Sequence, residues 1–179
     1  MQLRIIAGKY GGRLIKTPNG STTHPMSERA RNAVFNSLGN TILDKKILDC
    51  FAGSGAIGLE ALSRGAKEAY FIENDRIANR VIEENLKDLD ILDNVKQLKF
   101  AVGTFLDKFD DSFDVIFADP PYNKVPVEAI KRLSLFLNKD GYLILSLPKE
   151  FINIEIPGVS LISFKKYSEA NILIYKKLS

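Results

Sequence analysis

The segment that most restricts the fold of this chain is Gly53-Ser54-Gly55-Ala56-Ile57-Gly58, which matches the pattern G-x-G-x-x-G. A short predicted strand at 47–50 precedes it, and a helical pattern over about 56–64 follows it. Between a strand and a helix, such glycines allow a sharp turn and a close approach of the backbone to a ligand. Glu73 ends the next predicted strand, 20 positions after Gly53, where a carboxylate can bind ribose hydroxyls. The pattern predicts a nucleotide-like cofactor, and leaves a dinucleotide and S-adenosylmethionine both open.

From residue 46 onwards the chain alternates between strand and helix patterns. Such alternation predicts an α/β fold with a mostly parallel sheet and helices on both of its faces. The last pair of strand patterns adds an antiparallel C-terminal strand, and the first pair forms a short N-terminal β-hairpin. We predict strands over 3–7, 13–17, 47–50, 69–72, 95–101, 113–118, 142–146, 158–164 and 172–175, and helices over about 28–38, 56–64, 76–89 and 127–137. One domain over 1–179 accommodates them all, with an arm over 1–26 and a core over 27–179.

Composition argues against several classes of protein. One cysteine, Cys50, and one histidine, His24, make an internal disulfide or a zinc site unexpected, and we predict no metal. The chain has no apolar run long enough to cross a bilayer and no signal-peptide pattern, which favours a cytoplasmic protein. The net charge is +3, and residues 1–31 carry a basic excess made by Arg4, Lys9, Arg13, Lys16, Arg29 and Arg31. A basic arm suits a phosphate backbone, although a solvated basic face would explain the charge equally well.

Asp119-Pro120-Pro121-Tyr122 directly follows the predicted buried strand over 113–118. Its carboxylate would therefore lie in the crevice where open α/β sheets bind ligands. The two prolines stiffen the backbone, and the Pro120 carbonyl is an acceptor in a region with few backbone donors. A carboxylate, a rigid carbonyl and the flat ring of Tyr122 together suit a planar ligand with an exocyclic NH2 group. Without the glycine loop upstream, a plain Pro-Pro turn at the end of a strand would be an equal interpretation.

Two features favour S-adenosylmethionine over a dinucleotide. Asp49 lies just before the glycine loop, where its carboxylate can attract the ammonium of a methionine moiety, and a pyrophosphate would gain nothing from it. The segment 119–122 has no role in hydride transfer but has a clear one in the methylation of an amine.

Three motifs resemble known methyltransferases. The cofactor loop of class I methyltransferases is similar to residues 49–56, Asp49-Cys50-Phe51-Ala52-Gly53-Ser54-Gly55-Ala56. The D/N-P-P-Y/F/W motif of enzymes that methylate exocyclic amines of bases is similar to residues 119–122. The opening R-I-I-A-G-x-x-x-G-R of the methyltransferase D family, bacterial enzymes that act on guanine N2 of 16S rRNA, resembles residues 4–13, and residues 24–36 resemble the segment that follows it. The chain departs from that family at His24 and Met26, where Arg and Thr are usual, and at Val102, near which many relatives have Asp or Asn.

This resemblance implies a Rossmann-like class I methyltransferase with a seven-stranded sheet. The implied reaction is methyl transfer from S-adenosylmethionine to N2 of a guanine in 16S rRNA within the assembled small subunit. Because no segment of the sequence indicates an exposed apolar stripe, we expect a monomer. The expected amine-binding catalytic residues are Asp119, Pro120, Pro121 and Tyr122. The expected cofactor-binding residues are Asp49, Phe51, Ala52, Gly53, Ser54, Gly55, Glu73, Asn74 and Val102. The expected rRNA-binding residues are Lys9, Arg13, Arg29, Arg31 and Tyr122, with Tyr122 stacking on the base.

Three other functions are compatible with parts of the sequence. An N6-adenine DNA methyltransferase would share both motifs, although this chain has little room for a segment that recognises a DNA sequence. A nicotinamide-dependent oxidoreductase would share only the glycine loop. An RNA-binding relative without activity would have no use for the amine-binding segment at 119–122.

Overall fold

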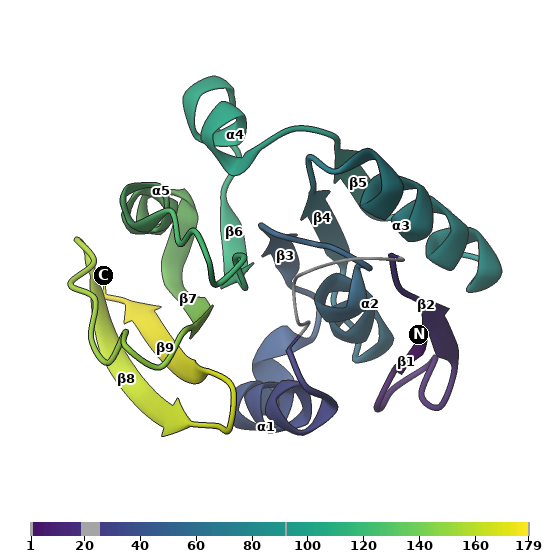
Figure 1. Cartoon of the computed structure of the whole chain (residues 1–179), viewed down its shortest axis with the longest axis horizontal. Coiled ribbons are helices and arrows are strands. Elements are labelled where there is room, and N and C mark those ends of the chain that lie inside the picture. The colour runs from purple at the N-terminus through teal and green to yellow at the C-terminus, as the bar shows by residue number, and fades with distance from the viewer. Residues whose placement is uncertain (1, 19–25, 92, 179) are drawn as a thin grey trace.

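The computed structural model describes residues 2–18, 26–91 and 93–178 of the 179-residue chain (Figure 1). The strands are β1 (Gln2–Arg4), β2 (Leu14–Lys16), β3 (Lys46–Asp49), β4 (Glu68–Ile72), β5 (Val95–Leu98), β6 (Phe113–Ala118), β7 (Leu137–Leu147), β8 (Val159–Lys166) and β9 (Asn171–Lys177). The helices are α1 (Glu28–Leu38), α2 (Ala56–Ser63), α3 (Arg76–Asp88), α4 (Val102–Lys108) and α5 (Val127–Arg132), with short 3-10 helices η1 (Gly39–Ile42) and η2 (Leu133–Phe136).

Seven strands form one sheet in the order β5-β4-β3-β6-β7-β9-β8, and β1 and β2 pair separately as an antiparallel hairpin. Strands β3 to β7 are paired in parallel, whereas β9 runs antiparallel to both β7 and β8. These pairings confirm the predicted mostly parallel sheet with its antiparallel C-terminal strand and N-terminal hairpin. The strand order reverses its direction between β3 and β6, so the carboxyl ends of these two strands border the crevice where such sheets bind ligands.

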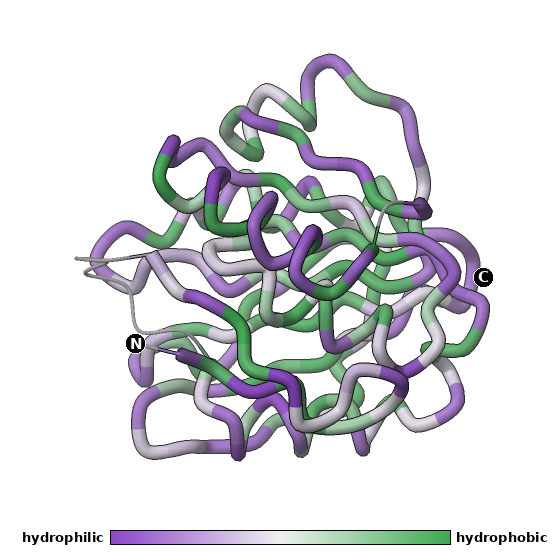
Figure 2. Tube along the Cα trace, turned by 90° about the vertical axis from the view of Figure 1, so that its right-hand side faces the viewer, coloured by the Kyte–Doolittle hydropathy of each residue, from purple (hydrophilic) through white to green (hydrophobic). Residues whose placement is uncertain are grey.

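The sheet is buried on both faces, and each face has its own hydrophobic core. On β3, Ile47 belongs to the core under α1, α2 and α3, while Leu48 belongs to the core under α4 and α5. On β6, Val115 belongs to the first of these cores and Ile116 to the second. Figure 2 shows the resulting pattern, with hydrophobic residues concentrated in the interior and hydrophilic ones around the outside. Burial on both faces explains why the parallel strands are almost continuously apolar, and it confirms the prediction of helices on both sides.

The structure differs most from the predicted elements in two regions, and β1 and β2 are also shorter than the predicted strands over 3–7 and 13–17. The strand predicted over 95–101 ends at Leu98, and α4 then begins at Val102. This helix has only seven residues, and its N-cap residue Ala101 makes no side-chain hydrogen bond, so it lacks the usual sequence signal for a helix start. The helix predicted over 127–137 ends at Arg132, and β7 already begins at Leu137. That early start reflects pairing with β6, a long-range contact that no local pattern encodes.

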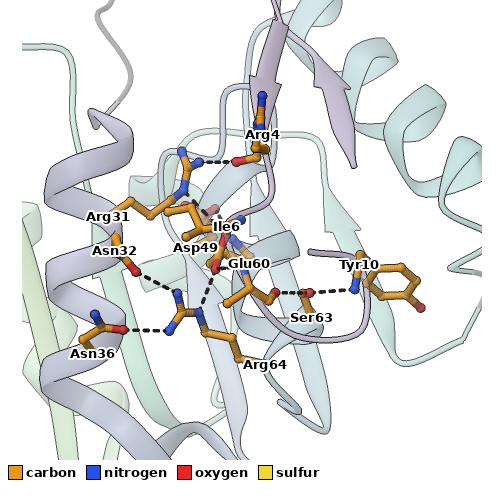
Figure 3. A network of polar contacts seen from close by, with 12 residues as sticks. Arg4, Ile6, Tyr10, Arg31, Asn32, Asn36, Asp49, Glu60, Ser63 and Arg64 are labelled. Carbon is orange, nitrogen blue, oxygen red and sulfur yellow. Dashed lines mark hydrogen bonds and ion pairs between the residues drawn. The ribbon is translucent and has the colours of Figure 1, made fainter. Parts of the chain in front are cut away.

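A buried carboxylate is one of the groups that fix the N-terminal hairpin to the core (Figure 3). The backbone N–H groups of Ile6 and Ala7 donate to Glu60 Oε2 at 2.7 Å and to Oε1 at 3.2 Å. Glu60 lies in α2 and is fully buried, and its Oε1 also accepts a hydrogen bond from Arg64 Nε at 2.7 Å. A buried carboxylate with three donors is well compensated for its loss of water. Glu60 therefore makes the arm an integral part of the fold.

The turn of the hairpin packs tightly against the end of α2. The Ser63 hydroxyl donates to the Ala7 carbonyl at 2.5 Å and accepts from the Tyr10 N–H at 2.9 Å, while the Ser63 carbonyl accepts from the Lys9 N–H at 2.7 Å. Gly8 has φ +82°, and a Cβ at this position would lie 1.8 Å from the Ser63 carbonyl oxygen. Glycine is therefore required there by both backbone conformation and space.

We expect Gly8→Ala to destabilise the protein much more than Gly12→Ala. Both glycines have a similar positive φ, +82° and +85°, but a Cβ at Gly12 would have no atom within 4 Å. Gly12→Ala should cost about 1–2 kcal/mol through backbone conformation alone, and Gly8→Ala roughly 1–3 kcal/mol more through the clash. Urea unfolding followed by circular dichroism measures both. Equal losses would show that the arm is not packed against Ser63 in solution.

Candidate active site

The polar residues expected to form the site converge at the carboxyl ends of the central strands. Asp49 is the last residue of β3, Glu73 follows β4, and Asp119 follows β6. Because β3 pairs with both β4 and β6, these three carboxylates share one edge of the sheet. Ser146, near the end of the next strand β7, joins them there. The sheet topology thus brings together the glycine loop and the segment 119–122, which are far apart in sequence.

The glycine loop has the geometry of a ligand-binding turn. The Gly53 N–H donates to Glu73 Oε2 at 2.8 Å, and a Cβ on Gly53 would meet no atom within 4 Å, so open space adjoins the loop. Gly58 serves packing instead, since a Cβ there would lie 2.3 Å from the Phe71 ring of β4. The close helix–sheet packing at Gly58 is the role expected of the last glycine of this motif, and the open space at Gly53 leaves room for a ligand beside the loop.

The carboxylate of Glu73 is held in place by backbone groups. Oε2 accepts from Gly53, and Oε1 accepts from the Asp75 N–H at 2.8 Å. The neighbouring Asn79 side chain donates to the Glu73 carbonyl at 2.9 Å, which fixes the chain after β4. Each carboxylate oxygen still has a free lone pair for a further donor, such as a ribose hydroxyl. Asn74, predicted to contact the cofactor, lies exposed beside it.

Asp49 is a buried carboxylate that is only half satisfied. Its Oδ2 accepts from the Gly58 N–H at 3.1 Å, while its buried Oδ1 has no hydrogen-bond partner among the described residues. Burial raises the pKa of Asp49 to about 7, although the Gly58 N–H opposes the shift; the charges of Asp119 and Glu73 add to it. An unpaired buried carboxylate oxygen is costly, and a cationic ligand would relieve that cost.

Asp119, which follows the neighbouring strand β6, also has one carboxylate oxygen with a hydrogen-bond donor and one without, among the residues that the structure describes. Its Oδ2 accepts from the Met26 N–H at 3.1 Å, and its buried Oδ1 has no partner in the described part of the chain. Burial raises the pKa of Asp119 to about 6, and the nearby Ser146 hydroxyl and the Met26 N–H limit the rise. Tyr122 is half-buried beside it, with its hydroxyl 2.9 Å from Ser146 Oγ. The site therefore offers an unoccupied acceptor next to an aromatic ring whose hydroxyl is fixed.

A pocket opens next to Tyr122. The first turn of α1, the end of β7 and the turn between β8 and β9 together form its walls. The lining residues are Met26, Ser27, Ala30, Tyr122, Ser146, Tyr167, Ser168, Glu169, Ala170 and Ile172.

The remaining predicted cofactor residues lie around the same strand ends. Ala52 and Ser54 are buried in the loop, Phe51 is half-buried, and Val102 is buried at the start of α4. The Ser54 carbonyl accepts from the side chain of Asn85 at 2.9 Å. Asn85 also hydrogen-bonds the backbone N–H and carbonyl of Lys16 at 2.8 and 3.0 Å, so it connects β2 of the arm to the cofactor loop. Asn85, Ser146 and the Met26 N–H could not be predicted as parts of the site, because nothing in the local sequence pattern distinguishes them.

The basic residues predicted to bind RNA fall into two groups. Lys9, Arg13 and Arg29 are exposed, and Arg13 donates to the Asp88 carbonyl at 2.9 Å. The prediction for Arg31 is wrong, because its side chain is only 1% exposed. Arg31 Nη2 donates to the Arg4 carbonyl at 2.5 Å, and Nε lies 3.8 Å from Glu60 Oε2. Arg31 thus holds the arm against α1 and α2 (Figure 3).

Three further predictions concern His24, a metal site and a membrane span. His24 lies outside the described residues. Within the described ranges, His, Cys, Asp and Glu side chains nowhere form a group of three that could hold a metal ion. In the same ranges, none of the helices has both the length and the apolar character needed to cross a membrane.

Comparisons with known proteins agree with this geometry. The sequence pattern of the family described as conserved hypothetical protein 95 matches residues 3–176. Ribosomal RNA small subunit methyltransferase D from Escherichia coli (strain K12) is 37% identical over 142 residues, which cover 79% of this chain and 70% of that protein. YlbH from Bacillus subtilis (strain 168), provisionally named an rRNA methyltransferase, is 31% identical over a 182-residue alignment that covers 98% of this chain and 99% of YlbH. The solved structure of yhhF from Escherichia coli superposes with a TM-score of 0.90 at 32% identity and covers 99% of both chains.

We expect Asp49→Asn to stabilise the ligand-free protein at pH 8 and to have little effect near pH 4. The folded-state pKa of Asp49, about 7, lies above the ordinary value of 3.8, so the buried charge destabilises the fold fully above pH 7 and not at all below pH 4. The gain at pH 8 should be a few kcal/mol, measured by urea unfolding at both pH values. Asp110→Asn, at an exposed position, is the control and should change little. An equal effect of Asp49→Asn at both pH values would contradict the buried charge.

Proposed function

Because the chain belongs to the conserved hypothetical protein 95 family and is a relative of the small-subunit ribosomal RNA methyltransferases D, we propose that it methylates 16S rRNA. The proposed reaction transfers a methyl group from S-adenosylmethionine to the exocyclic N2 of one guanine: a C–N bond forms, the S–CH3 bond breaks to leave S-adenosylhomocysteine, and the nitrogen loses one proton to Asp119 or to water. The fold is the Rossmann-like fold of class I methyltransferases, with the strand order and antiparallel β9 described above. The proposed substrate is the rRNA within the small ribosomal subunit, and the enzyme acts as a cytoplasmic monomer.

The observation that carries the proposal is a pair of buried, unpaired carboxylate oxygens on adjacent strands. Asp49 Oδ1 suits a cation next to the glycine loop, and Asp119 Oδ1 suits an N–H donor next to Tyr122. The two residues lie within electrostatic reach of each other, since the charge of Asp119 contributes to the raised pKa of Asp49. An ammonium-bearing cofactor and an amine-bearing substrate would therefore meet at the β3–β6 boundary.

The residues present fit S-adenosylmethionine. When bound, this cofactor supplies a methyl group on a sulfonium, which is already an activated donor. Asp49 would hold its ammonium, and Glu73 and Asn74 its ribose hydroxyls. The backbone of the loop, Phe51, Ala52, Gly53, Ser54 and Gly55, would lie along it, with Val102 forming one wall of the adenine site.

Asp119 and Pro120 would hold and orient the guanine amine. Asp119 Oδ1 accepts one N–H, and the carbonyl of the buried Pro120 accepts the other, which draws the nitrogen lone pair out of conjugation with the ring. Positioning of this kind can lower a barrier by roughly 7–11 kcal/mol in favourable cases. Pro121 keeps the segment rigid. Tyr122, fixed through Ser146, would stack on a guanine turned out of its helix, worth about 1–3 kcal/mol.

The exposed basic residues would hold the rRNA through its phosphates. Lys9 and Arg13 lie on the hairpin, and Arg29 lies in the first turn of α1, whose start also carries the Met26 N–H bonded to Asp119. Phosphate contacts of this kind position the RNA without reading its sequence.

We expect Asp119→Asn to reduce methyl transfer by at least about 100-fold, because an amide cannot replace the charged acceptor. The assay uses labelled S-adenosylmethionine, with small subunits and free 16S rRNA from a strain that lacks this protein as acceptors. Nucleoside analysis of the product should yield N2-methylguanosine. The wild-type rate should also fall as the pH drops below about 6, where Asp119 becomes protonated.

Asp110→Asn is the matched control for this assay and should keep full activity. An Asp119→Asn enzyme with near-normal turnover would contradict the role of Asp119. Methylation of duplex DNA without activity on either ribosomal substrate would identify an adenine DNA methyltransferase instead.

We expect Lys9→Ala and Arg29→Ala each to weaken rRNA binding and to lower its salt dependence. Each lost phosphate contact should reduce the slope of log K against log salt concentration by about 0.7–0.9. Lys139→Ala is the control, because Lys139 is exposed near the amino end of β7, away from the edge that carries the site. Filter binding over a range of salt concentrations gives the slopes. Equal slopes for wild type and both variants would show that these residues do not face the RNA.

A further inference from the structure

The amine-binding segment cannot by itself choose guanine. Adenine, cytosine and guanine all carry an exocyclic NH2 group, and Asp119 with the Pro120 carbonyl would accept its two hydrogens equally well. The ring atoms that flank the amine differ, however. Guanine has a donor there, N1–H, whereas adenine N1 and cytosine N3 are acceptors. A fixed group that can only accept, placed beside the amine site, would therefore favour guanine.

The pocket beside Tyr122 contains one such group. The other polar side chains among the described lining residues are the hydroxyls of serines and tyrosines, which both donate and accept and so cannot discriminate. Among the described residues that line the pocket, Glu169 is the one carboxylate, and an ionised carboxylate can only accept. Its side chain is exposed and makes no ion pair with any residue in the described ranges. This leaves the carboxylate available to a ligand.

Glu169 also lies close to the amine-binding segment. Burial raises the pKa of Tyr122 to about 12, and the charges of Asp119 and Glu169 both contribute to the rise. The Tyr122 ring is thus within electrostatic reach of two carboxylates, one at the end of β6 and one in the turn between β8 and β9. A base stacked on Tyr122 would present its edge to both of them.

The turn that carries Glu169 is held in a defined position. The Tyr167 N–H donates to the Ala170 carbonyl at 2.8 Å, which closes the turn. Asn171 is buried, and its side chain donates to the carbonyls of Lys149 and Phe151, both at 3.0 Å. Those bonds attach the start of β9 to the chain that follows β7. The backbone at Glu169 is therefore fixed relative to Ser146 and Tyr122.

We propose that Glu169 is the residue that selects guanine, by accepting a hydrogen bond from N1–H while Asp119 and Pro120 hold the amine. Adenine or cytosine would direct a ring-nitrogen lone pair at the carboxylate and be repelled. This inference rests on the proposed guanine-N2 methylation and assigns its base specificity to one side chain. A charged hydrogen bond of this kind should contribute about 10- to 100-fold to the preference for guanine.

The test replaces the target guanine with 2-aminopurine, which keeps the amine at C2 but has an acceptor at N1. Small subunits reconstituted with either base at the methylated position serve as substrates, and kcat/KM is measured on both. The quantity of interest is the ratio of the two values, compared between variants, because the intrinsic reactivity of each base then cancels. Wild type should favour guanine, and Glu169→Gln should reduce the ratio about tenfold or more, since a glutamine amide can donate to 2-aminopurine N1.

Glu169→Gln should keep most of its activity on guanine, because the amide oxygen still accepts from N1–H; this separates base selection from misfolding. Glu155→Gln removes the same charge at an exposed position outside the pocket and should leave the ratio unchanged. A Glu169→Gln ratio equal to that of wild type would overturn the role of Glu169 while leaving guanine methylation intact. Failure of wild type to form N2-methylguanosine would overturn the proposed function and this inference with it.

Discussion

The parallel pairing of β3 with β6 is the interaction on which the site depends. It aligns Asp49 with Phe117, two residues before Asp119, and so places two carboxylates from distant parts of the chain at one edge. Both strands are buried on both faces, so the pairing lies at the centre of the two hydrophobic cores. The pairing also sets the point where the strand order reverses, and the glycine loop and the segment 119–122 face each other across that point.

The buried carboxylate groups differ in how many hydrogen-bond donors their oxygens have, and this difference separates a structural carboxylate from the two at the candidate site. Glu60 has two backbone donors and the Arg64 side chain, with Arg31 nearby, and it holds the arm to the core. Asp49 and Asp119 each have one backbone donor and one bare oxygen, and both have raised pKa values. Such incomplete satisfaction lowers the stability of the ligand-free fold, and it also leaves binding free energy available to ligands.

The features that the sequence could predict are those fixed by local chemistry. The glycine loop, the strand over 113–118 and the helix capped by Ser27 were all evident, because turn glycines, apolar runs and caps act over a few residues. The burial of Arg31 was not evident, since it depends on α1 packing against an arm 27 residues away in sequence. Ser146 and Glu169 were missed for the same reason. Only the arrangement of β7, β8 and β9 brings them to Tyr122.

The contacts of the N-terminal hairpin have a consequence for the order in which the chain folds during synthesis. Ile6 needs Glu60, and Lys16 needs Asn85, so the hairpin segment is synthesised before the residues that hold it to the core. Until α2 and α3 have formed on the sheet, the hairpin has only its own short pairing, and isolated two-stranded hairpins are marginally stable in water. The Asn85 side chain donates both to the Lys16 carbonyl of the hairpin and to the Ser54 carbonyl of the cofactor loop. The hairpin therefore docks fully only when the cofactor loop has formed. A newly made chain would thus acquire its hairpin surface only after the cofactor half of the molecule is in place.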